Sequence, residues 1–193
     1  MKSGPFIKIV SKSYGIEEKT VSLVARFLKN AGLFSMAGRG INAPHVTPLD
    51  AARLTIALLA TDRPARAVEL TRIFCDLTVN HDFTEGEPPE YSSDPNYCEA
   101  LEDLLCDYFK GASRITFDLE ELEICEQTQE AILRLRPIKN SNQKRMLVCN
   151  GTRQQVENLI DNTNYYGRRT KRSVCRAALI PVQVALMQGG NIL

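Results

Sequence analysis

The chain has 193 residues, of which 44% are hydrophobic and 24% are charged, and its formal net charge is +1. This is the composition of an ordinary globular protein that can bury a sizeable core as one domain or two small ones. Apolar runs stay well short of the roughly 20 residues of a membrane span, and lysines interrupt any signal-peptide core near the N-terminus. We therefore expect a cytoplasmic protein without a membrane partner.

Two helices joined at a glycine are predicted at the N-terminus. Pro5 can begin the first helix, since its missing N–H is not needed there, and that helix runs to about Ser13. The second helix starts near Glu17 and stops at Gly32. Gly15 suits the turn because a positive φ costs glycine little.

The spacing within this pair is that of a helix-turn-helix, in which the first helix supports a second that enters the DNA major groove. Ser11 is the small residue where the helices cross. Apolar residues occupy the positions expected to be buried or to flank the crossing, namely Val10, Tyr14, Ile16, Val21 and Val24.

A wing is predicted to follow. Leu33–Ser35 is expected to be a short strand, and residues 36–48 are rich in glycine and proline, with Gly38-Arg39-Gly40 at their centre. A strand, a glycine-rich tip with an arginine and a return segment would form such a wing.

Further helices are expected along the middle of the chain. Thr47 is a natural N-cap with Pro48 in the first turn, which predicts an apolar core helix that ends before Pro64. Another helix is expected over 65–77 and one over 97–109. The polar, acidic and proline-containing residues 79–96 are interpreted as a linker or long loop between them.

The C-terminal half changes to a period of two, which indicates strands near 115–124, 131–135 and 146–149. A short helix is expected over 152–161, and the apolar end is expected to be a strand that becomes a helix at Pro181. The sequence thus predicts an α+β protein. Its predicted parts are a helical winged helix-turn-helix domain at 1–78, an acidic linker at 79–96, and a helix with a small antiparallel or mixed sheet at 97–193.

Charge is unevenly distributed along the chain. Residues 1–50 hold seven Lys/Arg against three Asp/Glu (+4), residues 81–125 two against thirteen (−11), and residues 134–193 eleven against two (+9). Two basic ends around an acidic middle fit two nucleic-acid surfaces with a spacer. They fit equally well acidic and basic segments that pack against each other.

Candidate DNA-binding residues lie in three places. The second helix carries Lys19, Thr20, Ser22, Arg26 and Lys29, which suit base edges and phosphates. Arg39 lies at the wing tip. The basic run near the C-terminus contributes Arg168, Arg169, Lys171 and Arg172, with a solvated strand face as its alternative interpretation. Glu17 and Glu18 stabilise a helix N-terminus but oppose the approach of DNA.

Catalysis is the least supported function class. The six cysteines form no CxxC pair, and the two histidines, His45 and His81, lie apart, so we expect no metal, no cofactor and mostly buried, reduced thiols. Hydrolase, nucleotide and metalloprotease motifs are absent from the sequence, which predicts a protein that is not an enzyme.

The segment Gly15 to Phe34, with Thr-Val at 20–21 and Ala-Gly-Leu at 31–33, resembles winged helix-turn-helix transcriptional regulators. The continuation RGINAPHVTPLDAARL looks like small proteins of phages and mobile elements. The resemblance covers about the first 60 residues. It implies a sequence-specific DNA-binding regulator whose second helix, at about 17–31, reads the major groove of double-stranded DNA, with dimerisation or partner binding by residues 97–193.

Two other functions fit the sequence. One is a phage-type component of DNA packaging or assembly, which uses the same helices in a larger oligomer. The other is an inhibitor module whose acidic middle binds a basic protein partner. A dimer is expected for the regulator, because one half-site alone offers few contacts.

Overall fold

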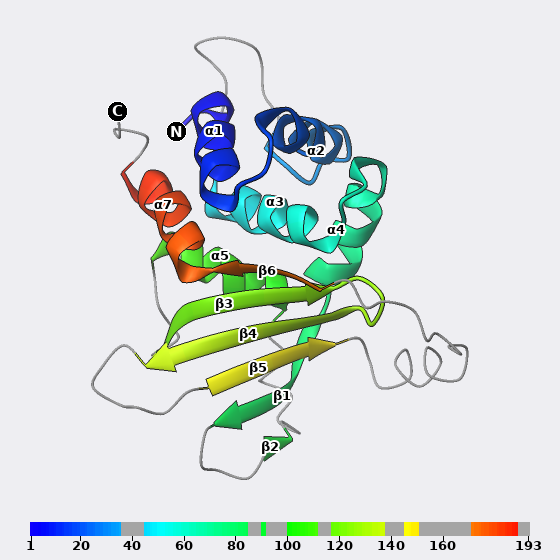
Figure 1. Cartoon of the computed structure of the whole chain (residues 1–193), viewed down its shortest axis with the longest axis vertical. Coiled ribbons are helices and arrows are strands. Elements are labelled where there is room, and N and C mark those ends of the chain that lie inside the picture. The colour runs from blue at the N-terminus through cyan, green and yellow to red at the C-terminus, as the bar shows by residue number, and fades with distance from the viewer. Residues whose placement is uncertain are drawn as a thin grey trace.

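The computed structural model describes residues 1–35, 45–84, 90–91, 100–111, 117–137, 145–150 and 171–188 (Figure 1). Its helices are α1 (Ser3–Tyr14), α2 (Glu18–Asn30), α3 (Pro48–Ala60), the short 3-10 helix η2 (Pro64–Arg66), α4 (Ala67–Cys75), α5 (Leu101–Lys110) and α7 (Arg176–Met187). Its strands are β1 (Thr78–Thr84), β2 (Glu90–Tyr91), β3 (Phe117–Cys125), β4 (Glu130–Pro137), β5 (Arg145–Asn150) and β6 (Lys171–Cys175).

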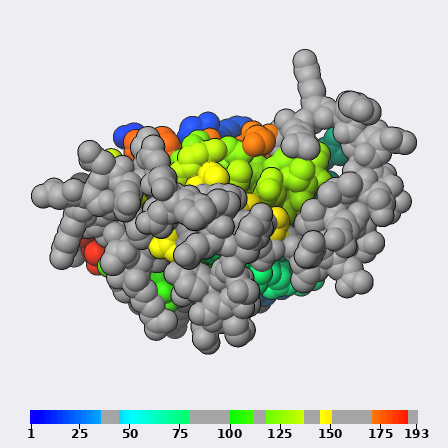
Figure 2. Space-filling view, turned by 90° about the horizontal axis from the view of Figure 1, so that it is seen from below, coloured from blue at the N-terminus to red at the C-terminus, as the bar shows by residue number. Residues whose placement is uncertain are grey.

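The described strands form one six-stranded sheet in the order β2-β1-β5-β4-β3-β6, and every pairing is antiparallel. The helices lie on one side of this sheet (Figure 1). Seen from the other side, residues of β3 and β4 are visible at the surface (Figure 2). The predicted α+β class and the antiparallel sheet are confirmed.

The turn between α1 and α2 is made at Gly15, whose φ of 67° lies in the left-handed region. Ser11 fixes this turn from inside α1, because its hydroxyl donates to the Ile16 carbonyl at 2.6 Å and its own carbonyl accepts from the Ile16 N–H at 3.1 Å. At the other end of α2, the chain leaves the helix at Gly32 with φ of 73°. Both glycines were predictable from the sequence, whereas these hydrogen bonds of Ser11 were not part of the prediction, which made Ser11 the small residue at the helix crossing.

The segment after α2 differs from the expectation. Leu33 and Phe34 form a bend and Ser35 is irregular, so the expected strand is absent; the Ser35 backbone N–H donates to the carboxylate of Asp50 and not to a neighbouring strand. The predicted wing tip, with Arg39, lies outside the described residues.

Helix α3 is the central core helix, as predicted. Thr47 and Asp50 form a capping box, in which the Thr47 side chain accepts from the Asp50 N–H while the Asp50 carboxylate accepts from the Thr47 N–H. Beyond the cap, nearly the whole helix is buried, including Leu54 and Ile56 with no exposed surface. The chain then turns at Thr61 and re-enters helix through Pro64.

Two further predictions of secondary structure are wrong. The stretch 79–96, expected as a linker or loop, contains β2 and most of β1, because β1 pairs with β5 on one side and with β2 on the other. Pairing with a distant strand satisfies the backbone of a segment that is polar by composition. The segment around Pro181, expected as a strand that becomes a helix, is helical throughout α7.

Packing explains why α7 tolerates an internal proline. Leu179, Val182 and Ala185 recur at helical spacing and are all at most 1% exposed, so their burial offsets the hydrogen bond lost at Pro181.

The hydrophobic core runs through both halves of the chain. It joins residues of α1, α2 and α3 with residues of α5, β3, β4 and α7. Helix α7 packs beside α1, and α5 packs against α3 (Figure 1). On β3 and β4 the buried residues alternate with charged ones, with Leu122 and Leu133 facing each other across the pair on the inner face. The predicted helix at 152–161 lies outside the described residues.

Candidate nucleic-acid interface

The outer face of α2 is the part of the predicted interface that the structure displays most openly. Val21, Val24, Ala25 and Leu28 turn into the core, which fixes the rotation of the helix. Lys19, Ser22 and Arg26 are consequently exposed on the opposite side. A surface hollow extends over this face and is lined by the neighbouring residues Glu17, Glu18, Lys19, Ser22, Leu23 and Arg26.

The other two candidates on α2 are less exposed. Thr20 is half-buried. Lys29 is half-buried too, because its ammonium donates to the Ser3 hydroxyl of α1 at 3.2 Å and lies 5.3 Å from the centre of the Phe34 ring. Lys29 therefore links α2 to α1, and the structure groups Lys19, Ser22 and Arg26 without it.

The outer face of α2 is mixed in charge at its N-terminal end. The ammonium of Lys19 lies 4.0 Å from the Glu17 carboxylate, and both side chains are well exposed, at 92% and 67%. Such a pair contributes little to stability and opens readily. Arg26 lies further along the same helix and has no ion pair within the described part of the chain. Its guanidinium carbon lies 5.9 Å from the centre of the Phe27 ring.

Two further cations lie on α1, the helix that precedes α2. Lys8 and Lys12 are exposed on α1, a helix that has no acidic residue. The sequence signal that could have identified them is their spacing of four residues, which places both on the polar side of the first helix. Within the described ranges, neither forms an ion pair.

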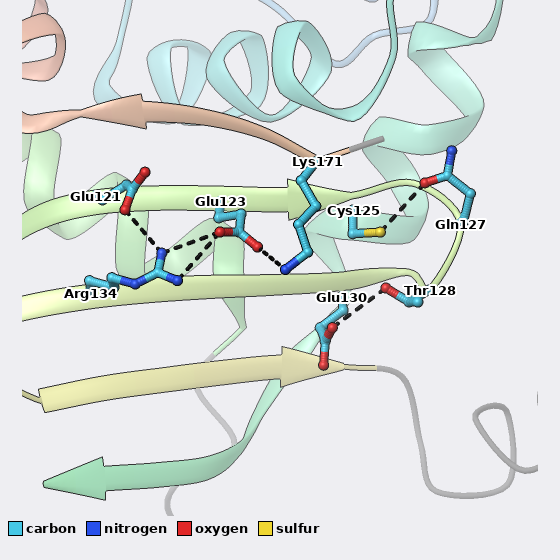
Figure 3. Close-up of polar contacts among 8 residues, drawn as sticks. All are labelled: Glu121, Glu123, Cys125, Gln127, Thr128, Glu130, Arg134 and Lys171. Atoms are coloured by element: carbon cyan, nitrogen blue, oxygen red, sulfur yellow. Dashed lines mark hydrogen bonds and ion pairs between the residues drawn. The ribbon is translucent and has the colours of Figure 1, made fainter. Parts of the chain in front are cut away.

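The cations Lys171 and Arg172 of the sheet, unlike Lys8 and Lys12, are paired with carboxylates. Lys171 on β6 is hydrogen-bonded to Glu123 on β3 at 2.6 Å, and Glu123 also accepts from Arg134 on β4 (Figure 3). This hydrogen bond raises the pKa of Lys171. The bond from Lys171, reinforced by Arg134 and opposed by partial burial, lowers the pKa of Glu123.

Arg172 is turned toward the helices. Its guanidinium donates to the carbonyl of Ala60 at the end of α3 at 3.3 Å, and it lies 3.5 Å from Asp62 and 3.9 Å from Glu126. Lys171 and Arg172 were predicted to contact DNA, but the structure places them on the sheet, where carboxylates of the same chain meet their charges. Arg168 and Arg169, from the same predicted basic run, lie outside the described residues, as does Arg39.

Similar pairs recur across the sheet and its helices. Asp118 on β3 accepts from Arg176 at 2.5 Å and lies 3.5 Å from Arg136, and Glu126 is paired with Arg66. The uneven charge along the sequence had two interpretations, nucleic-acid surfaces or acidic and basic segments that pack against each other. On β3, β4 and β6 the second interpretation applies, because their acidic and basic side chains pair with each other. Lys8, Lys12 and Arg26, on α1 and α2, form no ion pair with any residue that the structure describes.

Five of the six cysteines lie in the described part of the chain, and all five are free thiols. Cys75, Cys106, Cys125 and Cys149 are buried and free, and burial raises the pKa of Cys149 to about 12. Cys175, on β6, is exposed and departs from the expectation of buried thiols. In the part of the chain that the structure describes, no three metal-ligating side chains gather into a group that could hold a metal ion.

Comparison with known proteins gives no relative: no family model, curated protein or solved structure matches this chain. None of the helices in the described ranges is long and apolar enough to cross a membrane.

Proposed function

We propose that this protein binds double-stranded DNA through the outer face of α2 and acts as a sequence-specific transcriptional regulator. The observation that carries the proposal is the contrast in charge pairing. Lys8, Lys12 and Arg26 on the helix pair lack carboxylate partners among the described residues, whereas Lys171 and Arg172 on the sheet have them. Unpaired, exposed cations on a helix-turn-helix are the groups that phosphates attract.

The role proposed for each side chain follows from its position on α1 or α2. Ser22 and Arg26 project from the middle of the exposed face of α2, where a helix in the major groove reaches base edges and phosphates. Lys8 and Lys12 lie on α1, the helix that crosses the DNA backbone in this motif. Glu17 and Glu18 repel phosphates, so binding requires them to lie along the groove floor, where a glutamate can accept from the amino group of cytosine.

A dimer is part of the proposal. One α2 helix offers only a few base contacts, and two copies related by a two-fold axis would read two half-sites one helical turn apart.

The test is selection of bound duplexes from a random-sequence pool by the purified protein at two salt concentrations. Enrichment of two spaced half-sites is the expected result. Salt-sensitive binding without any enriched motif would overturn the proposal of a sequence-specific regulator and would favour a role in DNA packaging or another architectural role. Absence of binding at low salt would overturn DNA recognition altogether.

The selected duplex then allows the face to be assigned. The double variant Lys19→Ala, Arg26→Ala should weaken binding by at least tenfold, as expected when two charge contacts are lost. The matched control is Lys110→Ala, Lys171→Ala, which removes the same charge from exposed positions on α5 and β6. Equal losses in the two double variants would show that net charge, and not this face, drives binding.

A further inference from the structure

Helix α7 is apolar on its outward face as well as on its buried face. The buried face packs Leu179, Val182 and Ala185 into the core, each at most 1% exposed. No charged residue occurs between positions 177 and 188. A helix that is hydrophobic all round is normally buried on every side, yet α7 lies at the margin of the helices, beside α1 (Figure 1).

The outward face of α7 forms a continuous apolar stripe. The residues of this α7 stripe recur at helical spacing opposite the buried side, and they are Ala177, Ile180, Pro181, Val184 and Met187. Ala177, Pro181 and Met187 are exposed, and Met187 is 61% exposed, the one large hydrophobic side chain that is exposed among the described residues. Ile180 and Val184 are half-buried and do not belong to the hydrophobic core. One copy of the chain therefore leaves this stripe uncovered.

The α7 stripe has no charge with which to attract a charged partner. The helix has no acidic residue in its first turn and no basic residue in its last turn. Arg176, at its start, is held by Asp118 of the same chain at 2.5 Å. A helix that lies on a lipid surface has a basic polar face, which α7 lacks. The surface that suits this stripe is another uncharged one, because no charge then loses its water.

The α7 stripe is also symmetric about its middle. Ala177 and Met187 lie five positions before and after Val182, and Ile180 and Val184 lie two positions before and after it. If two α7 helices meet antiparallel across a two-fold axis, Ala177 of each copy faces Met187 of the other, and Ile180 faces Val184. A short side chain then meets a long one at both ends of the contact. The stripe is thus complementary to itself in shape and in charge.

We propose that the α7 stripe is the surface through which two copies of this chain dimerise, by antiparallel contact of their α7 helices. This dimer does not depend on DNA binding. Helix α7 packs beside α1, and α1 packs beside α2. Where the proposed function also holds, the α7 contact therefore sets the separation of the two α2 helices and, with it, the spacing of the half-sites.

The first experiment is sedimentation equilibrium of the full chain over a range of concentrations. The molar mass should approach twice the 21.6 kDa of one chain. Because one helix from each copy makes a small interface, the mass should fall toward that of one chain on dilution. A chain that stays monomeric at every concentration would overturn the inference. A mass that rises beyond a dimer would overturn it too, since a two-fold contact closes at two copies.

Two charge variants test the α7 stripe directly. Ala177→Glu and Met187→Lys each place an unpaired charge in the contact, and each should raise the dissociation constant of the dimer at least about tenfold. A carboxylate near the helix N-terminus and a cation near its C-terminus both favour the helix, so α7 should stay folded. Ala65→Glu is the matched control, because it adds the same charge at an exposed alanine of η2. It should leave the dissociation constant unchanged.

The double variant tests the antiparallel pairing. With Ala177→Glu and Met187→Lys in one chain, each glutamate faces a lysine of the other copy, so the dimer should be at least about threefold tighter than in either single variant. Within one chain the two positions lie roughly 15 Å apart along the helix, a distance at which salt screens their interaction. A double variant no tighter than the single variants, or equal losses in Ala65→Glu and Ala177→Glu, would overturn the inference.

Selection of duplexes by the variants separates this inference from the proposed function. If both are correct, the wild type selects two spaced half-sites and Ala177→Glu selects single half-sites. A dimer that follows the charge variants but binds no DNA would support the α7 stripe and reject the proposed function. Two half-sites selected by a protein whose dimer ignores the charge variants would leave DNA binding standing and reject the α7 stripe.

Discussion

Replacing Gly15 by alanine tests whether the turn between α1 and α2 depends on backbone conformation alone. The φ of Gly15 is 67°, and a Cβ built on it would meet nothing within 4 Å. Steric clash with neighbours therefore contributes nothing, and the cost is that of an L-residue in the left-handed region, about 1–2 kcal/mol. For a chain of this length, that corresponds to a fall in Tm of about 2–8 °C.

Gly4→Ala is the matched control. A Cβ on Gly4 would also meet nothing within 4 Å, but Gly4 lies inside α1 without a positive φ. There alanine should leave stability unchanged or raise it by up to about 1 kcal/mol, because it favours the helix. Gly15→Asn should fall between Gly15→Ala and the wild type, since asparagine tolerates the left-handed region better than alanine.

The measurement is urea unfolding followed by far-UV circular dichroism, with m-values compared to confirm that the unfolding reaction is the same. If Gly15→Ala were as stable as Gly4→Ala, the turn would not require a positive φ, and the argument from glycine to a helix-turn-helix would fail. A loss well above about 2 kcal/mol would show that Gly15 has a packing role that the structure does not display.

Further predictions concern the buried groups and the sheet. Tyr108→Phe should preserve stability or raise it by up to about 1 kcal/mol in urea unfolding, because the Tyr108 hydroxyl is buried and has no hydrogen-bond partner in the described part of the chain; a clear loss would reveal a partner. In native thiol labelling read by peptide mass spectrometry, Cys175 should react first among the five described cysteines and Cys149 only on unfolding, since Cys149 is fully buried and its pKa is raised to about 12; early labelling of Cys149 would contradict the packing of β5. Because the hydrogen bond from Lys171 lowers the pKa of Glu123 in the folded protein, the ionised carboxylate stabilises the fold above the pKa of an unfolded glutamate, and this stabilisation is lost as the pH falls through the folded pKa. The stability advantage of the wild type over Glu123→Gln should therefore shrink between neutral pH and about pH 3, and an advantage that does not depend on pH would refute the ion pair.

Local features of the helical region were predictable from the sequence because short-range physics decides them. Gly15 and Gly32 end helices through backbone conformation, and Thr47 with Pro48 begins one through capping. The buried face of α2 follows from the spacing of Val21 and Val24 alone. The α+β class and the antiparallel sheet likewise follow from the change of period along the chain.

The candidate site was only partly predictable, because exposure depends on neighbours. Lys29 and Arg26 are both basic residues of α2, yet Lys29 is drawn to Ser3 of α1 while Arg26 stays exposed. Lys171 and Arg172 belong to a basic run of the kind that contacts nucleic acids. Antiparallel pairing of β6 with β3, however, places Lys171 beside an acidic strand. Charge counts along a sequence do not reveal which charges meet in space.

The two N-terminal helices with their glycine turn, the cap of α3 and the alternating strands could be predicted from the sequence, since each depends on residues a few positions apart. Long-range packing was needed to establish that residues 78–84 form a strand, that α7 keeps its helix through Pro181, and which of the described cations meet a carboxylate. Those outcomes depend on contacts between distant segments, where pairing with β5, burial against α1 and the carboxylates of β3 outweigh local preference.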